Sequence, residues 1–318
     1  MNNLGNIKKI KGDASHRKFF RKKIKKITSI VVFSKKEKIK NLLIYDAINK
    51  VLNKNKILAP QLYRENYIKN YIEIQDFGNK TIFKILIKKK IDKFIYFKRI
   101  IKILKQIQSI KNRSVKNFKK KNYKISKYDR EILIKEANLI CDWYIKKTLS
   151  KNKRAEFSKK FEKIIKKLTL NLKLKNDVFV HRDFHVSNLM TINNQIAVID
   201  SQDAVIGNRA YDLASLIDDV RLKTTKNFKK KIYSFYLKKQ NKLDKLKFKN
   251  DFEILSVLRN LKIIGIFTRL AMRDYKKKYL KLIPHAWELI NLRINENKVF
   301  KDLNNLLNQN FKKKLNES

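Results

Sequence analysis

Three polar residues in the middle of the chain have types and spacing that suit phosphoryl transfer. The stretch VHRDFHVSNLM covers residues 180–190, where Asn188 follows Asp183 by five positions, and the later apolar run IAVID ends in Asp200. A carboxylate can orient a hydroxyl group and take its proton, and Asn and Asp oxygens are hard ligands that Mg²⁺ accepts. The pattern predicts Asp183 as the catalytic base, with Asn188 and Asp200 holding Mg²⁺ on nucleotide phosphates.

The combination of these residues is more specific than any part of it. His-Arg-Asp, four residues and Asn form the catalytic-loop pattern of kinases, in which ATP is the phosphoryl donor. His-Arg-Asp alone is common, but a strand that ends in Asp twelve residues after Asn188 is not. We expect His181 to support the loop by packing and hydrogen bonding. His185 has two interpretations, the same structural role or a place in the wall of the acceptor site.

The elements that must position these residues form two groups along the chain. Short runs rich in Ile, Val and Phe predict strands at 18–34 and 66–78, around a helix at 37–57 with one apolar side. Two short strands at 177–200 would carry the motif, with a hairpin turn at 192–194. Helical periodicity dominates the rest of the sequence, at 81–110, 128–149, 155–170, 251–273 and 285–293.

A small lobe followed by a larger one is the simplest architecture for this order of elements. We expect an α+β fold with a small β-rich N-terminal lobe at 1–76, which binds the nucleotide. A larger, mainly helical lobe at 77–318 would carry catalysis and the substrate. The hinge between them is expected at Glu73 to Gly78.

The composition is extreme in charge but even in distribution. The 318 residues include 79 Lys and Arg against 28 Asp and Glu, a formal net charge of +51. Such a charge can indicate a nucleic acid or an anionic membrane as partner. Lysine is spread along the whole chain, however, while only 5 Gly and 2 Pro occur, which favours compositional drift with lysine at solvated positions. We therefore expect no nucleic-acid partner, although the charge leaves that alternative open.

Other features exclude several classes of protein. A single cysteine, Cys141, allows neither an internal disulfide nor a cysteine-rich metal site, and its apolar helical surroundings predict a core position. The first twenty residues lack the apolar segment of a signal peptide, and the longest apolar runs are too short to cross a bilayer. The expectation is a cytoplasmic protein without a membrane partner.

The motif and its continuation resemble the aminoglycoside phosphotransferase and choline kinase-like family, a branch of the protein-kinase fold. Residues 199–219, IDSQDAVIGNRAYDLASLIDD, are similar to the segment that follows the metal-binding Asp in that family. A narrower resemblance, to the kinases that phosphorylate the anomeric hydroxyl of N-acetylmuramate and N-acetylglucosamine, covers roughly residues 10–290. Four segments carry it: GDASHRKFFR (12–21), YIEIQDFGN (71–79), EANLICDWYI (136–145) and the helical stretch 260–287.

The resemblance implies roles for further residues. Gly12 and Ser15 would lie in the nucleotide loop, the backbone from Glu73 to Asp76 would meet adenine, and Asp212 would be a buried structural carboxylate. Phe33 lies near the position where protein kinases carry their phosphate-binding lysine. Other cations must then face the phosphates, and the candidates are Arg17 and Arg21, with Lys18 as a further possibility.

These observations predict an ATP- and Mg²⁺-dependent kinase of a small-molecule sugar or amino sugar. The favoured reaction is sugar 1-phosphate formation in peptidoglycan recycling. The alternatives are another acceptor, namely an aminoglycoside, choline or a different sugar, and a non-catalytic nucleic-acid-binding protein on a kinase-like fold. Intact Asp183, Asn188 and Asp200 oppose the last alternative.

Overall fold

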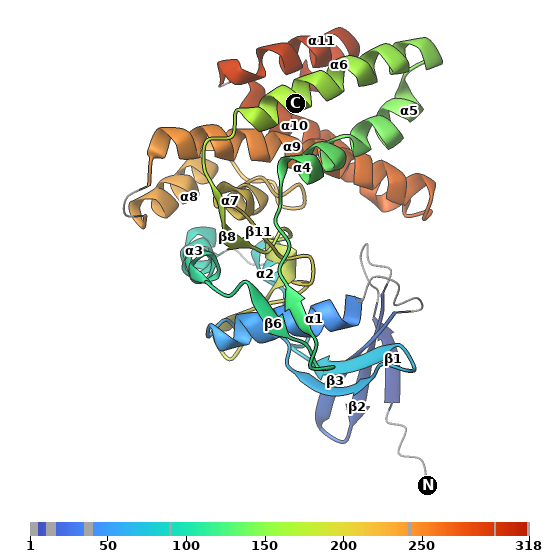
Figure 1. Ribbon diagram of the computed structural model, residues 1–318, viewed down its shortest axis with the longest axis vertical. Coiled ribbons are helices and arrows are strands. Elements are labelled where there is room, and N and C mark those ends of the chain that lie inside the picture. Colours follow the sequence, from blue (N-terminus) through green and yellow to red (C-terminus); the bar gives the residue numbers. More distant parts are fainter. Residues whose placement is uncertain are drawn as a thin grey trace. The chain divides into compact units, whose positions relative to one another are not determined.

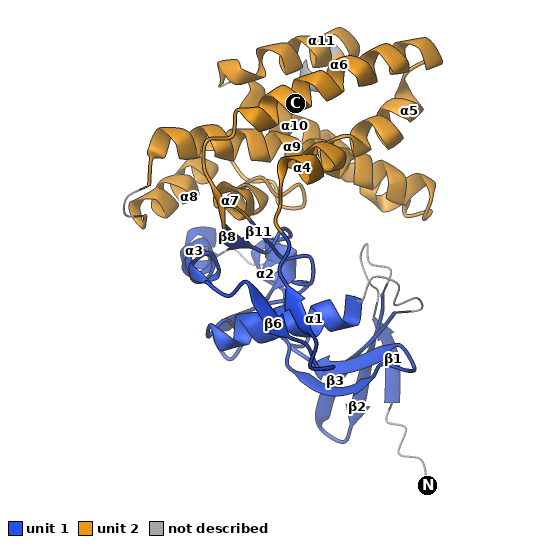
Figure 2. Ribbon diagram, viewed as in Figure 1, with its two compact units in different colours: residues 1–126, 178–206 blue, residues 127–177, 207–318 orange. Residues whose placement is uncertain are grey.

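The computed structural model describes residues 6–10, 17–34, 41–88, 91–240, 243–295 and 297–316, and side chains as far as 311. Figure 1 shows the helices and strands of the chain, and Figure 2 colours the two compact units into which it divides. Unit 1 consists of residues 1–126 and 178–206, and unit 2 consists of residues 127–177 and 207–318. Each unit is described by itself.

The first unit is built on a five-stranded antiparallel sheet. Its spatial order is β1 (Asn6–Ile10), β2 (Lys18–Ile24), β3 (Ile27–Phe33), β5 (Tyr71–Gln75) and β4 (Leu62–Asn66). The strands at 18–34 were predicted, and the run 66–78 contains β5, but β4 was not recognised because its central residues Tyr63, Arg64 and Glu65 are exposed and carry no apolar alternation.

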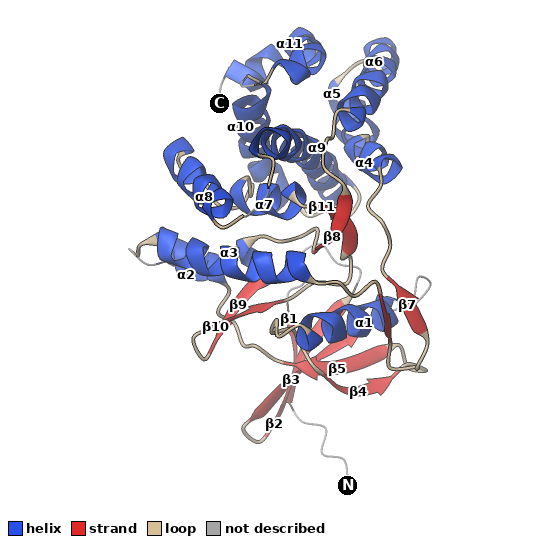
Figure 3. Cartoon of the chain, turned by 60° about the vertical axis from the view of Figure 1, so that its left-hand side comes forward, coloured by secondary structure: helices blue, strands red, loops and turns tan. Residues whose placement is uncertain are grey.

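The helix α1 (Asn41–Lys54) covers this sheet, as Figure 3 shows. Its Leu42 and Tyr45 pack against Val32, Ile72 and Ile74 of the sheet. The helix lies within the predicted range 37–57. The residues of α1 that are buried are thus on the apolar side that the 3.6-residue period predicts.

A hairpin carries the motif residues of this unit. Strands β9 (Leu189–Ile192) and β10 (Gln195–Val198) pair antiparallel, and Asn193 and Asn194 turn between them with φ of 46° and 58°. Asn tolerates this left-handed conformation better than most residues. The hairpin is therefore confirmed at the predicted position, 192–194.

Contacts on both sides tie that hairpin to the segment after β5. Met190 and Ala197 form a small core with Phe77, and the Thr191 amide donates to the Lys80 carbonyl. The predicted helix at 81–110 is divided into α2 (Ile82–Lys88) and α3 (Lys93–Ser109), because Asp92 caps α3 by accepting a hydrogen bond from the Phe94 amide. A short hairpin, β6 (Ser114–Lys116) with β7 (Asn122–Lys124), completes the unit.

The second unit is helical and is organised around one long helix, α9 (Lys245–Met272). It packs against α4 (Arg130–Ala137), α7 (Ala210–Ile217), α10 (Ile283–Ile294) and a six-residue π-helix, η1 (Ile140–Ile145). The remaining elements of this unit are α5 (Lys146–Thr148), α6 (Lys151–Leu170), α8 (Lys226–Lys238), η3 (Lys277–Leu282), η4 (Lys298–Phe300) and α11 (Lys301–Asn316).

Two strands, β8 (Asn176–Val180) and β11 (Val205–Asn208), run from one unit into the other. The predicted boundary between residues 76 and 77 falls inside unit 1. The division into a nucleotide-binding and a catalytic lobe remains a prediction. No helix among the described residues is long and apolar enough to span a membrane.

Candidate active site

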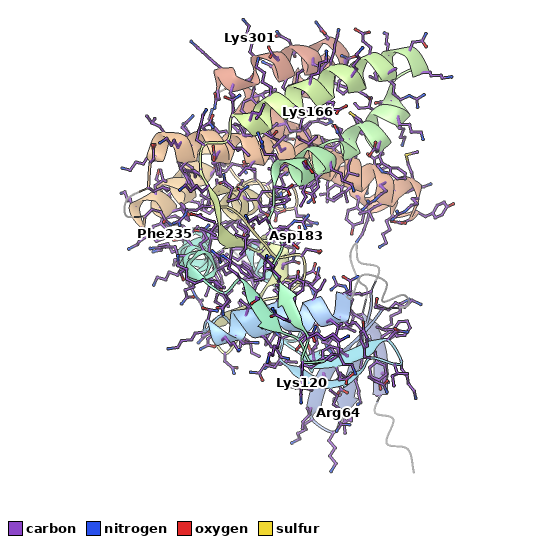
Figure 4. All side chains as sticks on the ribbon, viewed as in Figure 1. Arg64, Lys120, Lys166, Asp183, Phe235 and Lys301 are labelled. Atoms are coloured by element: carbon purple, nitrogen blue, oxygen red, sulfur yellow. The ribbon has the colours of Figure 1, made fainter. Side chains whose placement is uncertain are left out.

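Asp183 lies on a short loop that its own hydrogen bonds hold in place. The loop follows β8, whose last residues are buried, and Asp183 is labelled in Figure 4. The amide of His185 donates to the Asp183 carbonyl over 3.0 Å, and the amide of Asn188 donates to the His185 carbonyl over 2.9 Å. These bonds fix the backbone, so the half-buried Asp183 carboxylate is presented by a rigid turn.

Asn188 is bound through the nitrogen of its side-chain amide. Nδ2 donates to the Asp183 carbonyl over 3.0 Å. The Oδ1 atom accepts no hydrogen bond from any residue that the structure describes, so an oxygen ligand is left for a cation. The backbone carbonyl of Asn188 accepts from the Ile199 amide over 3.0 Å, which places Asn188 beside the strand end that carries Asp200.

The two histidines of the motif are buried. The Nε2 atom of His181 lies 3.1 Å from the Ile199 carbonyl. Burial lowers the pKa of His181 despite the nearby Asp183 charge, so the ring is neutral at pH 7 and supports the loop, as predicted. His185 is also buried, and its Nε2 atom lies 3.5 Å from Nδ2 of Asn188.

Asp200 is placed at a point where negative charge accumulates. Its backbone has φ 62°, and its side chain is 40 % exposed. Loss of solvation raises the pKa of Asp200. The charge of Arg17 opposes this rise, whereas the charges of Asp183 and Asp203 add to it. A divalent cation would relieve the repulsion between these carboxylates.

Arg17 is the cation that the structure brings to this carboxylate. Its Nη2 atom lies 3.1 Å from Oδ1 of Asp200, and its side chain is only 7 % exposed. The guanidinium lies over the rings of Phe19 and Tyr45, with its carbon 5.7 Å and 5.5 Å from their centroids. Two aromatic faces and an ion pair thus hold Arg17 at the site. Lys18, by contrast, is exposed, and it pairs with Phe33 across β2 and β3.

Arg21 lies elsewhere, in a tight complex with the turn after β5. It binds Asp76 with two nitrogens, at 2.6 Å and 2.9 Å, and donates to Asn79 Oδ1 and to the Gly78 carbonyl. Although burial raises the pKa of Asp76, the hydrogen bonds from Arg21 and from the Gly78 amide outweigh burial and lower it. Arg21 and Asp76 therefore bind each other and stabilise the turn at the expected hinge. Their contact with a nucleotide remains a prediction.

The Glu73 side chain is engaged within the sheet. It accepts a hydrogen bond from Ser29 Oγ over 2.6 Å and pairs with Lys22 over 3.2 Å. These bonds outweigh the effect of burial and lower the pKa of Glu73. The predicted adenine contact involves the backbone of Glu73 and not its side chain, and it remains a prediction. Gly12 and Ser15, assigned to the nucleotide loop, lie outside the described residues.

A polar network behind Asp200 was missed by the sequence reasoning. Ser201 donates to Oδ1 of Asn49 over 2.7 Å, and Asn49 donates to the Pro60 carbonyl over 3.0 Å. One helical turn earlier, Tyr45 lies under Arg17, and burial together with the Asp200 charge raises its pKa to about 12. The signal was present in the sequence, because Tyr45 and Asn49 have i, i+4 spacing within the buried side of the helix.

Two further residues named from the sequence lie in unit 2. Asp212 is fully buried in α7, in agreement with a structural role. Cys141 lies in η1, and burial raises the pKa of its thiol to about 12, so it is not a nucleophile at pH 7.

The donor set at the Asp200 site fits magnesium rather than a metal held by protein alone. Asp200 supplies a carboxylate and Asn188 an amide oxygen, both hard ligands. Within the described ranges, no group of three or more His, Cys, Asp or Glu could hold a metal ion. Mg²⁺ bound by these two residues would complete its coordination with phosphate oxygens and water, as it does with nucleotides.

Comparison with known proteins identifies the family of the chain. The sequence matches the family described as "Phosphotransferase enzyme family" over residues 6–247. An N-acetylmuramate/N-acetylglucosamine kinase from Neisseria meningitidis serogroup B is 27 % identical over 281 residues, which are 86 % of this chain and 80 % of that protein.

Solved structures show the same fold. A Plasmodium vivax ethanolamine kinase aligns with TM-score 0.62 and 18 % identity over 88 % of this chain and 80 % of that one. The aminoglycoside phosphotransferase APH(4)-Ia aligns with TM-score 0.62 and 9 % identity over 90 % and 93 %. The kinase-like α+β fold and the resemblance drawn from the sequence are confirmed.

Proposed function

The chain belongs to the phosphotransferase enzyme family and is an ATP-dependent kinase, and we propose that its acceptor is an amino sugar, which it phosphorylates at the anomeric hydroxyl. N-acetylmuramate and N-acetylglucosamine, released during peptidoglycan recycling, are the acceptors in question. The observation that carries this proposal is the relationship to the meningococcal kinase of these sugars, which extends over 86 % of the chain.

Each candidate site residue would have its own part in the reaction. Asp183 would orient the acceptor hydroxyl and take its proton, on the loop fixed by the amides of His185 and Asn188. An anomeric hydroxyl is more acidic than other sugar hydroxyls, so a carboxylate is a sufficient base. The rate enhancement would come mainly from orientation and from neutralised phosphate charge.

Asn188 Oδ1 and Asp200 would hold Mg²⁺, which supplies neutralisation of phosphate charge when bound. Arg17, 3.1 Å from Asp200, would face the same phosphates in place of the kinase lysine. Adenine would meet the backbone from Glu73 to Asp76, and Gly12 and Ser15 would contribute backbone amides to the phosphates. The Arg21–Asp76 pair supports this assignment by bracing the end of β5.

Other small-molecule acceptors are the competing proposal. Ethanolamine and choline kinases and aminoglycoside phosphotransferases share the fold at 9–18 % identity, which carries no information on the acceptor. The amino-sugar assignment is favoured because a relative named for these acceptors is 27 % identical over most of the chain.

The test measures ATP consumption by the purified protein with each amino sugar, and locates the phosphate by NMR. We expect phosphate on the anomeric oxygen of one or both sugars. Methyl glycosides of the same sugars, whose anomeric oxygen is blocked, should not be phosphorylated. Phosphorylated methyl glycosides would place the reaction at another hydroxyl, and turnover with choline or an aminoglycoside alone would reject the amino-sugar acceptor.

Asp183→Asn is the matched control for this assay. It keeps the shape of the loop but removes the base, so kcat should fall by roughly 10²–10⁴-fold while ATP still binds. Turnover by this variant close to that of the unaltered protein would remove Asp183 from the mechanism.

A further inference from the structure

A small cavity in the helical unit is unusually rich in cations. It has a volume of about 200 Å³ and lies among residues of α8, α9 and α10. Of the ten described residues that line it, five are Lys or Arg, against 79 of 318 in the whole chain. The five are Lys226, Lys229, Lys230, Lys249 and Arg293. The cavity is therefore about twice as cationic as even this lysine-rich sequence predicts.

Two of these cations are buried beside a single carboxylate. Arg293 binds Asp218 with two nitrogens, at 2.9 Å and 3.1 Å, and Lys229 pairs with the same carboxylate at 3.1 Å. The side chains are 11 % exposed for Arg293, 5 % for Lys229 and 0 % for Asp218. Two positive charges around one negative charge leave a net charge of +1 in a poorly solvated place, which an anion would stabilise.

Among the described residues that line the cavity, cations outnumber carboxylates. Glu253, the carboxylate among these residues, binds Lys249 over 2.6 Å and accepts from Asn297 over 2.9 Å. Lys226 and Lys230 are exposed at the cavity. Counted over the described lining and Asp218, five cations and two carboxylates give a local charge of +3.

One neutral donor in the lining is also suited to an anion. The hydroxyl of Tyr233 is buried and has no hydrogen-bond partner among the residues described. Burial raises the pKa of Tyr233 to about 12, and the Glu253 charge adds to this effect while Arg293 opposes it, so the hydroxyl keeps its proton. A buried donor of this kind is costly unless a ligand or water accepts from it.

The apolar part of the lining is aromatic. The Phe252 ring has the Arg293 guanidinium carbon 4.9 Å from its centroid, and the Tyr233 ring centroid lies 5.0 Å away. Phe252 therefore stiffens Arg293, and the cavity presents an apolar surface next to its cations.

We propose that this cavity binds the phosphate group of a small phosphorylated molecule. A phosphate dianion matches a local charge of +3 and offers several acceptor atoms to Lys, Arg and the Tyr233 hydroxyl. The volume of about 200 Å³ limits the ligand to small-molecule size. The site lies wholly in unit 2 and does not depend on which acceptor the kinase phosphorylates.

The test is isothermal titration calorimetry of the full chain with inorganic phosphate and with phenyl phosphate, at constant ionic strength. We expect saturable binding of at least one of them. Tighter binding of phenyl phosphate would identify a phosphate ester as the ligand, whereas equal affinity would identify free phosphate. No saturable binding of either ligand to the unaltered protein would overturn the proposal.

Variants of one helix separate this site from phosphate held elsewhere by the general positive charge. The double change Lys226→Gln and Lys230→Gln should weaken binding roughly tenfold or more, because two charged donors are lost. The matched control, Lys231→Gln with Lys238→Gln, removes the same charge from exposed positions of α8 outside the cavity and should leave affinity within about twofold. Equal weakening by both double variants would overturn the proposal.

Tyr233→Phe provides a second readout that charge does not affect. It should weaken phosphate binding roughly three- to tenfold without lowering the thermal stability of the free protein, because the hydroxyl has no protein partner in the described chain. Unchanged affinity in this variant would show that the cavity does not bind phosphate in this way.

Discussion

At the scale of single residues, the chain separates two arginines that look equivalent in the sequence. Arg17 reaches Asp200, 183 positions away, while Arg21 binds Asp76 and the following turn. They stand four residues apart in GDASHRKFFR, a spacing that would place both side chains on one face of a continuous strand. Arg17, however, precedes β2, whereas Arg21 lies within it. Their different surroundings give each a separate prediction.

Asp200→Asn should lower Mg²⁺-supported turnover by roughly 10²-fold or more, because a charged metal ligand is replaced by a neutral one. Asn is chosen because it tolerates the left-handed backbone of this position, φ 62°, better than Ala. The measurement is the rate of ATP consumption against Mg²⁺ concentration. Asp203→Asn is the control, and loss of Mg²⁺ dependence in that variant instead would mean that the ligand has been misassigned.

Arg17→Gln should lower kcat/KM for ATP by roughly 10- to 100-fold, since a buried cation is lost beside Asp200, the carboxylate expected to hold Mg²⁺. Steady-state kinetics with varied ATP would show the effect. Lys18→Gln removes the same charge from the exposed neighbouring position and should change kcat/KM little. A similar loss in both variants would assign the effect to the overall charge rather than to Arg17.

At the scale of elements, close contacts between distant segments hold strands and helices in place. The turn after β5 is braced by Arg21 and Asp76, and the α9 helix approaches η1 so closely that only glycine fits between them. Each of these contacts joins segments that are far apart in the sequence. Their energetic contributions can be measured separately from catalysis.

Arg21→Gln should lower the free energy of unfolding by about 1–3 kcal/mol at pH 7, because the Asp76 carboxylate, 2 % exposed, loses a bidentate partner. The pKa of Asp76 is lowered in the folded protein, so this stabilisation is fully present above its unfolded pKa of about 3.9. It is lost as pH falls through the lowered folded value.

Urea unfolding of both proteins between pH 7 and pH 2.5 tests this expectation. The difference in stability should be constant down to about pH 4 and should shrink below it. Lys166→Gln, which breaks an exposed pair with Glu162, is the control and should show little effect. A difference that grows toward acid pH would contradict the assignment.

Gly265→Ala should destabilise the protein by about 1–3 kcal/mol, although alanine is normally the better helix residue by about 1 kcal/mol. A Cβ atom at this position would lie 2.3 Å from the backbone carbonyl of Leu139 and 2.6 Å from the amide nitrogen of Ile140. The helix or the π-helix would have to shift. Thermal unfolding measures the loss, and Lys245→Ala at the start of α9 is the control; a stabilised Gly265→Ala would show that the contact is loose.

At the scale of the whole molecule, the charge of +51 is the property that most needs a test. The structure gives some of it local uses, at Arg17 and in the cationic cavity of unit 2. Much of the rest consists of exposed lysines such as Lys231, Lys238 and Lys245. A solvated surface of this kind attracts polyanions without selecting among them.

Binding to nucleic acid should therefore be weak, independent of sequence and steeply dependent on salt, and lost near physiological ionic strength. Fluorescence anisotropy with several DNA and RNA oligonucleotides, from low salt to about 0.2 M, measures this. Tight binding that persists at the upper salt concentration, or that selects one sequence, would favour a nucleic-acid partner.

The sequence by itself determined the local features of the fold and of the candidate site. Asp183, Asn188 and Asp200 lie within eighteen residues, and the hairpin at 192–194 that arranges them is local as well. The α1 helix followed from its own periodicity. Such features depend on hydrogen bonds and side-chain contacts between near neighbours, which a short stretch specifies.

Only the tertiary structure decided which distant residues meet. Strand β4 pairs with β5 although its sequence gives no strand signal, and Arg17 rather than Arg21 faces Asp200. The cationic cavity combines α8, α9 and α10, which no local pattern relates. These contacts depend on packing and on charge compensation between segments that the whole fold brings together. Residue types and spacing could therefore name candidate site residues but could not decide which of them meet.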